Sequence, residues 1–166
     1  MTLEEFNALS ESEAMGLLRP LVTISAWAKT VCAARPFASL EQALMVAEQA
    51  AQAWQPQDIT QALAAHPRIG ERAAGGSKEA QLSRGEQATL NLSQQQSIDA
   101  LQQGNHAYER RFGQVFLIRA KGRSAQEILD NLQRRLLNSP QEELAETAEQ
   151  LRQITLLRFK ECFTHD

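Results

Sequence analysis

The chain has 166 residues, of which 43% are hydrophobic and 22% are charged. This length suits one domain of ordinary size, and the composition lacks the low hydrophobicity and high charge that are typical of disordered proteins. Seventeen Lys and Arg against 20 Asp and Glu give a net charge of -3, and the basic residues are scattered along the chain. We therefore expect a single domain over 1–166 that folds alone and has no nucleic acid partner.

No segment of the sequence predicts a membrane span or a targeting signal. Residues 1–10 contain Glu4 and Glu5 and lack a cationic stretch followed by an apolar one, so they do not resemble a secretory signal. No apolar run approaches the ~20 residues that a bilayer span needs, and the last three residues are not a peroxisomal address. Cys32 and Cys162 have no metal-binding spacing and are predicted to be reduced core thiols. We expect a cytoplasmic protein without a membrane partner.

The predicted elements are helices, because helix-start signals recur and apolar residues follow them at helical spacing. A Ser or Thr with Glu or Gln three residues later is a capping box, which satisfies the N–H groups at a helix start. Such pairs begin at positions 2, 10, 39, 83, 93, 124 and 139. In chain order we predict helices over 3–8, 11–18, 21–34, 40–54, 57–64, 84–91, 94–111, 125–138 and 140–163. The predicted fold class is an all-α, single-domain bundle of about eight to nine helices.

Two stretches depart from the helical pattern. The first covers 66–83, which contains one proline and three glycines. Loops of this length in a compact domain are more often functional than idle. The second covers 112–118, which is aromatic and β-branched and has no strand partner in the sequence. A lone extended segment leaves backbone N–H and C=O groups available for binding.

His66 is the first candidate for chemistry, because it directly precedes Pro67. A residue before proline is driven out of helical geometry, so the preceding helix should end there and leave the imidazole near its C-terminus. The helix dipole at that end favours the protonated form of the imidazole. The alternative is a histidine that only caps the helix at the surface, which is the commoner role.

Ser83, Glu86 and Gln87 form the second candidate group. Their spacing places a hydroxyl, a carboxylate and an amide on one face of the first turn of a helix. The alternative is again structural, because Ser83 and Glu86 form a capping box like six others in this chain.

Arg158 is the third candidate, because it falls on the predicted buried face of the last helix. That face follows a spacing of four and three residues: Leu144, Ala148, Leu151, Thr155, Arg158 and Cys162. A buried arginine needs an acidic partner or an anionic ligand, and its planar fork suits carboxylate, ureido or imide groups. A structural ion pair and a side chain that reaches back to the surface are the alternatives.

Several common chemistries have no motif here. The sequence contains no P-loop, no GxGxxG, no HExxH, no GxSxG and no paired-cysteine metal motif. We therefore expect no metal ligand among its residues and a reaction that rests on side chains alone.

An ordered set of motifs spans essentially the whole chain. It consists of HPRIG at 66–70, SRGEQ at 83–87, then Asn105, Tyr108, Phe112-Gly113, Phe116, Ile154 and Arg158. This set resembles the family of 2-oxo-4-hydroxy-4-carboxy-5-ureidoimidazoline (OHCU) decarboxylases, which act in the pathway from urate to allantoin. The resemblance implies an all-helical fold and the decarboxylation of OHCU to (S)-allantoin and CO2.

The resemblance also implies roles for individual residues. His66 corresponds to the catalytic acid/base, Glu86 to the residue that assists it, and Arg158 to the catalytic arginine of the last helix. The implied substrate contacts are Pro67, Ser83, Gln87 and the segment of Phe116, Leu117 and Ile118.

The implied reaction needs no cofactor, because a conjugated C=N bond of the substrate can hold the electron pair that CO2 leaves behind. The partner is then a small ureidoimidazoline. The resemblance leaves a homodimer open, although no coiled-coil seam in the sequence indicates one. Two rival functions are a hydrolase or racemase acting on an allantoin-like ureide, and a helical interaction module without activity.

Overall fold

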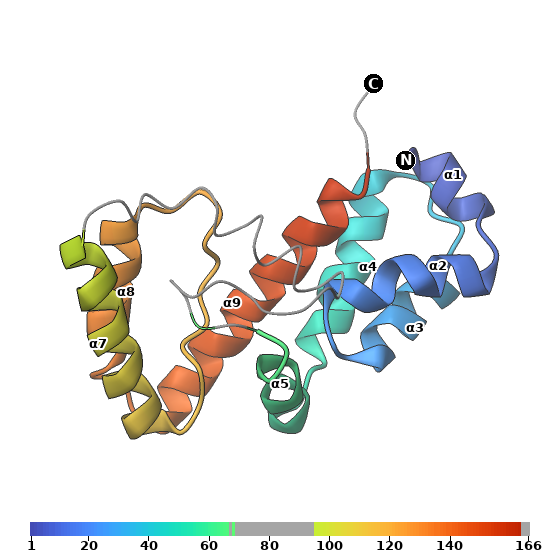
Figure 1. The fold of residues 1–166 in the computed structure, drawn as a ribbon. Helices are drawn as coiled ribbons and strands as arrows, with labels where there is room; N and C mark the ends of the chain where they lie inside the picture. The colour runs from blue at the N-terminus through green and yellow to red at the C-terminus, as the bar shows by residue number, and fades with distance from the viewer. Residues whose placement is uncertain (67, 69–94, 164–166) are drawn as a thin grey trace.

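The computed structural model describes residues 1–66, 68 and 95–163, and the elements within these ranges are helices (Figure 1). They are α1 (Leu3–Ala8), α2 (Glu11–Leu18), the short 3-10 helix η1 (Arg19–Leu21), α3 (Ser25–Ala33), α4 (Leu40–Gln52), α5 (Pro56–Leu63), α7 (Gln95–Phe112), α8 (Ala125–Arg135) and α9 (Pro140–Glu161). No strand occurs in these ranges, and the all-α class is confirmed. The helix predicted over 84–91 lies outside the described residues. Among the helices listed above, none has the length and apolar character needed to cross a bilayer.

Most predicted helix starts are confirmed by their caps. The side chains of Ser10, Ser124 and Ser139 each accept a hydrogen bond from the backbone N–H three residues later, and the Glu at that position binds back to the cap. Thr2 and Ser39 accept the same backbone bond. The boxes that begin at 83 and 93 lie outside the described residues.

The predicted helix over 21–34 is wrong at its start, because α3 begins only at Ser25. Residues 19–21 form η1, with Pro20 in its first turn, and both Val22 and Ile24 have extended backbone. Three consecutive β-branched residues lose side-chain freedom in a helix, which disfavours the helical conformation at 22–24. Val22 and Ile24 are nevertheless buried, so this connection fills the core without being helical.

Helix α9 is the longest described element and lies between two groups of helices (Figure 1). On one side, apolar residues of α1–α5, their connections, Leu117 and the second half of α9 form a cluster that we call the N-terminal core. Its aromatic residues meet edge to face, with ring centroids of Phe6 and Phe159 at 6.1 Å and of Trp27 and Phe159 at 6.0 Å. Such contacts add to the stabilisation that apolar burial provides.

On the other side of α9, helices α7 and α8 form a smaller cluster, the α7/α8 core. Its buried members are Leu101, Tyr108, Phe116, Ile118, Ala120, Ile128, Leu129 and Leu132. The two helices approach so closely at Gly104 that a Cβ atom there would lie 2.2 Å from a methyl carbon of Leu132. Glycine is therefore required for this approach unless Leu132 moves.

The segment 113–120 joins the two cores. Gly113 has φ +67, a left-handed conformation that suits glycine and turns the chain out of α7. The residues 115–120 that follow have no helical or strand structure, and the buried side chains of 116–118 alternate between the two cores. Phe116 and Ile118 enter the α7/α8 core, whereas Leu117 enters the N-terminal core. Within the described residues no strand pairs with this segment.

Candidate active site

His66 lies just beyond the end of α5. Its backbone N–H donates to the carbonyl of Leu63 at 3.1 Å, in a tight turn that ends the helix before Pro67, as predicted. The residue as a whole is partly exposed, but its ring nitrogen Nε2 is shielded from solvent. The turn thus aims one edge of the imidazole into the protein.

The protonation state of His66 differs from the expectation drawn from the sequence. Burial and, to a smaller extent, the positive charge of Arg158 lower the pKa of His66 from its ordinary 6.5 to about 3. The expectation that the helix dipole favours the protonated ring is wrong, because desolvation and a nearby cation both oppose a second positive charge. At neutral pH the ring is a neutral imidazole, able to accept a proton.

Arg158 is buried, with 2% of its surface exposed. Its Nη1 donates to the carbonyl of Leu21 at the end of η1, at 2.9 Å. This burial confirms the prediction for Arg158 and excludes a side chain that reaches back to the surface. Of the predicted face, Leu151 and Thr155 are also buried, whereas Leu144, Ala148 and Cys162 are partly exposed. The guanidinium therefore meets η1 from α9 and acts electrostatically on His66, which brings together two of the three predicted catalytic residues.

Phe116, Leu117 and Ile118 are all buried in the segment between the cores. Leu117 shares the N-terminal core with Leu21, the residue whose carbonyl binds Arg158. One residue of the segment therefore packs in the same apolar cluster as the residue that binds Arg158, whereas Phe116 and Ile118 pack in the α7/α8 core.

Four predicted site residues lie outside the described residues. They are Pro67, Ser83, Glu86 and Gln87. Their placement beside His66 remains a prediction.

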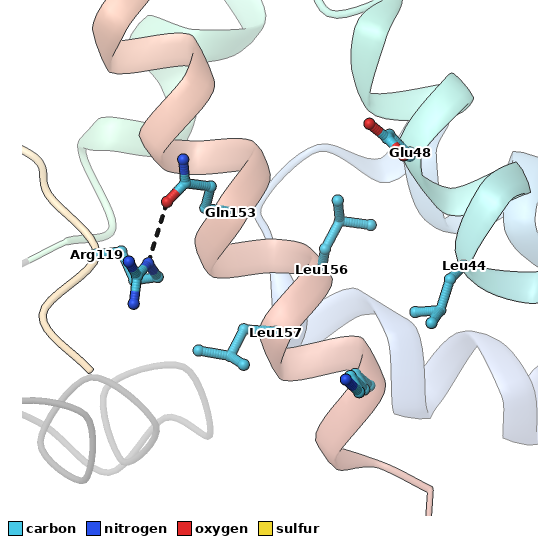
Figure 2. A pocket seen from close by; sticks show the side chains of 7 residues that line it. Leu44, Glu48, Arg119, Gln153, Leu156 and Leu157 are labelled. Atoms are coloured by element: carbon cyan, nitrogen blue, oxygen red, sulfur yellow. Dashed lines mark hydrogen bonds between the residues drawn. The ribbon is translucent and has the colours of Figure 1, made fainter. Parts of the chain in front are cut away.

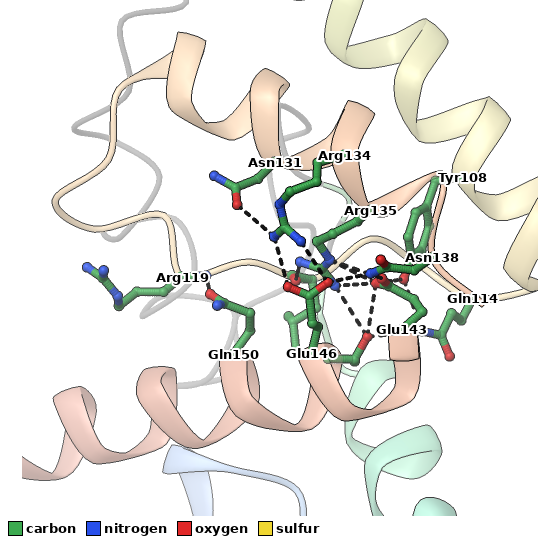
Figure 3. Close-up of polar contacts among 12 residues, drawn as sticks. Tyr108, Gln114, Arg119, Asn131, Arg134, Arg135, Asn138, Glu143, Glu146 and Gln150 are labelled. Carbon is green, nitrogen blue, oxygen red and sulfur yellow. Dashed lines mark hydrogen bonds and ion pairs between the residues drawn. The ribbon is translucent and has the colours of Figure 1, made fainter. Parts of the chain in front are cut away.

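A buried polar cluster lies where α7, α8 and α9 meet (Figure 3). Arg135 and Glu143 form an ion pair in which each side chain is 1% exposed. The hydroxyl of Tyr108 donates to Glu143 at 2.5 Å, and Arg135 Nη2 donates to the hydroxyl of Thr147 at 3.3 Å. Burial and the bond to Glu143 raise the pKa of Tyr108 to about 12, so the phenol keeps its proton.

The motifs of the sequence include Tyr108 of this cluster but not Arg135, Glu143 or Thr147, although a signal for a buried Arg135 was present. Arg135 follows Ile128 and Leu132 at the spacing of a buried helix face, the same pattern that singled out Arg158. Its neighbour Arg134 behaves as a surface residue and pairs with Glu146 at 2.8 Å.

A separate hollow of about 400 Å³ lies over α9 (Figure 2). Leucines from α4 and α9 line it, together with charged and amide side chains: Leu44, Glu48, Arg119, Gln153, Leu156, Leu157 and Lys160. Of the predicted site residues that the structure describes, none lines it. Across residues 1–66, 68 and 95–163, no group of three His, Cys, Asp or Glu side chains is arranged to hold a metal ion.

Comparison with known proteins points to one family. The family model described as OHCU decarboxylase matches residues 7–160. The 2-oxo-4-hydroxy-4-carboxy-5-ureidoimidazoline decarboxylase of Haloferax volcanii is 26% identical over 168 residues, which cover 100% of this chain and 98% of that protein. The uric acid degradation bifunctional protein TTL of Arabidopsis thaliana is 34% identical over 110 residues, 64% of this chain and 34% of that protein.

A solved structure is similar in fold as well as in sequence. It is the crystal structure of an OHCU decarboxylase in the presence of (S)-allantoin, with a TM-score of 0.70 and 28% identity. The match covers 89% of this chain and 96% of the solved one.

Proposed function

The chain belongs to the OHCU decarboxylase family, and on this premise we propose that it converts OHCU to (S)-allantoin and CO2. This is the last step from urate to allantoin in purine breakdown. The observation that carries the proposal is the neutral imidazole of His66 within electrostatic reach of the buried guanidinium of Arg158.

The reaction requires little more than a base, an acid and oriented hydrogen-bond donors. The bond between the ring carbon and its carboxylate breaks, CO2 leaves, and the electron pair forms a C=C bond as the neighbouring C=N pair moves onto the ring nitrogen. The ring nitrogen takes up a proton from water. The hydroxyl on the first carbon loses its proton and becomes the carbonyl of allantoin. The carbon that carries the ureido group gains a proton on one face, which sets the S configuration. No cofactor is needed, because the substrate ring accepts the electron pair.

We assign the proton transfers to His66. A pKa of about 3 in the ligand-free protein keeps the ring neutral at neutral pH, so its nitrogen is unprotonated but only weakly basic until the substrate binds. The anionic substrate adds a negative charge that opposes the effect of Arg158 and raises the pKa of His66. The resulting imidazolium then protonates the ring carbon. Glu86 orients the imidazole of His66 or restores its protonation state.

Arg158 stabilises the transition state most if it binds the ring or ureido oxygens of the substrate. An ion pair to the departing carboxylate would stabilise the ground state, where that charge is fully developed, more than the transition state. Its bond to the Leu21 carbonyl orients the guanidinium fork, so the remaining donors have a set direction.

The segment of Phe116, Leu117 and Ile118 supplies backbone N–H groups to the substrate oxygens. One oriented donor of this kind is typically worth about 3 kcal/mol in the transition state. The further contacts that we propose come from Pro67, Ser83 and Gln87.

The cellular setting follows from the same assignment. We propose a cytoplasmic enzyme whose partner is its small-molecule substrate, without nucleic acid or membrane partners. A homodimer is the assembly to test first.

The test generates OHCU in situ from urate with the two upstream enzymes and follows allantoin by circular dichroism. We expect the native protein to speed the appearance of one enantiomer and to release CO2, which a racemase or ureide hydrolase would not do. His66→Ala should lose this acceleration, by about 10²–10⁴-fold for a positioned acid/base.

His106→Ala is the matched control, because His106 is an exposed histidine of α7. Racemic product at the spontaneous rate with the native protein would refute the decarboxylase and favour the helical interaction module.

A further inference from the structure

We infer that Arg135 is a positioning residue that sets the direction of the Ile118 N–H group in the active site. The inference rests on the proposed function, which assigns substrate binding to the backbone of 116–118. Arg135 lies on α8 and none of the motifs includes it.

One guanidinium contacts two consecutive residues of the segment. Arg135 Nη1 donates to the carbonyl oxygen of Leu117 at 2.8 Å. The carbon at the centre of the same guanidinium lies 4.5 Å from the centre of the Phe116 ring, a cation–π contact. Arg135 thus holds both a backbone group and a side chain of the segment.

The bond to Leu117 decides where the next N–H points. The carbonyl of Leu117 and the N–H of Ile118 belong to one planar peptide unit, in which they point in opposite directions. When Arg135 holds the carbonyl toward α8, the N–H of Ile118 must point away from the polar cluster. A charged donor on the carbonyl also polarises the peptide unit, so its N–H becomes a stronger donor.

The following peptide unit is held from α9. The N–H of Arg119 donates to Gln150 Oε1 at 2.9 Å, and Arg119 Nε donates to Gln153 Oε1 at 3.0 Å. Ile118 therefore lies between two anchored peptide units, one bound to α8 and one to α9. This double anchoring is a reason for a lone extended segment to keep one conformation.

The rest of the cluster holds the guanidinium itself. Glu143 on α9 accepts from Arg135 Nε at 2.9 Å, and Tyr108 and Asn138 also donate to that carboxylate. A buried ion pair is seldom required for stability, because well-packed apolar side chains of similar size often stabilise a protein as well. The orientation of the 117–118 peptide is a role that an apolar pair could not perform.

The test compares three variants under the allantoin assay, with thermal unfolding measured for each. The double variant Arg135→Met, Glu143→Met removes both charges and keeps apolar packing, so it should fold. We expect its kcat to fall by about 10²-fold, the usual loss when one oriented donor is removed, while its melting temperature stays near the native value. Arg135→Lys keeps the charge but lacks the fork that reaches Glu143 and Leu117 together, and should lose activity in part.

Arg134→Met is the matched control. It removes the neighbouring arginine of α8 and its exposed pair with Glu146, and should leave kcat unchanged. A second readout is the amide NMR signal of Ile118, which should shift on addition of (S)-allantoin in the native protein and in Arg134→Met but not in the double variant.

The outcomes separate the two proposals. A native protein without turnover would refute the proposed function. A native protein with turnover and a folded double variant of unchanged kcat would overturn only the role of Arg135. Loss of folding in both Arg135 variants would also overturn it, in favour of a purely structural ion pair.

Discussion

The two regions that α9 joins bury different kinds of side chain. The N-terminal core packs aromatic and aliphatic side chains, and polar groups buried beside it donate to backbone carbonyls: the indole N–H of Trp27 to Ala47 at 3.0 Å and Arg158 Nη1 to Leu21 at 2.9 Å. The α7/α8 core instead packs beside an ion pair, a phenol and a threonine hydroxyl (Figure 3). Apolar packing depends on volume and tolerates many arrangements, whereas a charged network is satisfied by one geometry. The molecule thus combines a region held mainly by apolar packing with one in which a charged network holds a backbone segment in place.

The largest effect should follow from removing half of the buried ion pair. Glu143→Ala leaves Arg135 charged, buried and without its carboxylate, which should lower the free energy of unfolding by about 3–5 kcal/mol. Urea denaturation measures this loss. If the network behaves as described, adding Arg135→Met to Glu143→Ala should recover part of it, because the stranded charge is removed.

The N-terminal core should respond differently. Leu18→Ala creates a cavity at a fully buried position, and we expect a loss of about 3 kcal/mol in the free energy of unfolding. A second deletion nearby should add to this loss, since no stranded charge is relieved. If a second deletion in the N-terminal core instead restored stability, the two regions would not differ in this respect.

Replacement by lysine should have different effects on the arginines of the two regions. Arg158→Lys keeps the charge but loses the planar fork, so kcat/KM should fall by about 10–100-fold with little change in KM for a transition-state contact. Steady-state kinetics on OHCU checks this prediction. Unchanged kinetics would contradict the role of the guanidinium fork.

The smallest effect concerns the pH dependence of stability. The folded pKa of His66 is about 3, against an ordinary value of 6.5. As the pH falls below 6.5, His66 binds a proton in the unfolded chain but not in the folded protein. The stability that is present above pH 6.5 is therefore lost progressively toward pH 3. Because the residue is partly exposed, we expect about 1–2 kcal/mol of this loss between pH 7 and pH 5.

Urea denaturation at the two pH values, in the native protein and in His66→Gln, isolates this contribution from that of the carboxylates. His106→Gln, at an exposed position of α7, should behave like the native protein. An equal loss in all three proteins would contradict the depressed pKa.

Much of the fold could be predicted because its signals are local. Capping boxes at Ser10, Ser124 and Ser139 mark helix starts through contacts three residues apart. The start of α3 was missed, because apolar spacing through Val22 and Ile24 looks the same whether the backbone is helical or extended.

The sequence by itself determined the helical class, the end of α5 before Pro67 and the buried face that carries Arg158, since each depends on neighbours within one or two turns. Only the tertiary structure decided that His66 is neutral and that Arg135 donates a hydrogen bond to the carbonyl of Leu117. The reason is physical: desolvation, charge proximity and side-chain reach are set by residues distant in the chain, which packing alone brings together.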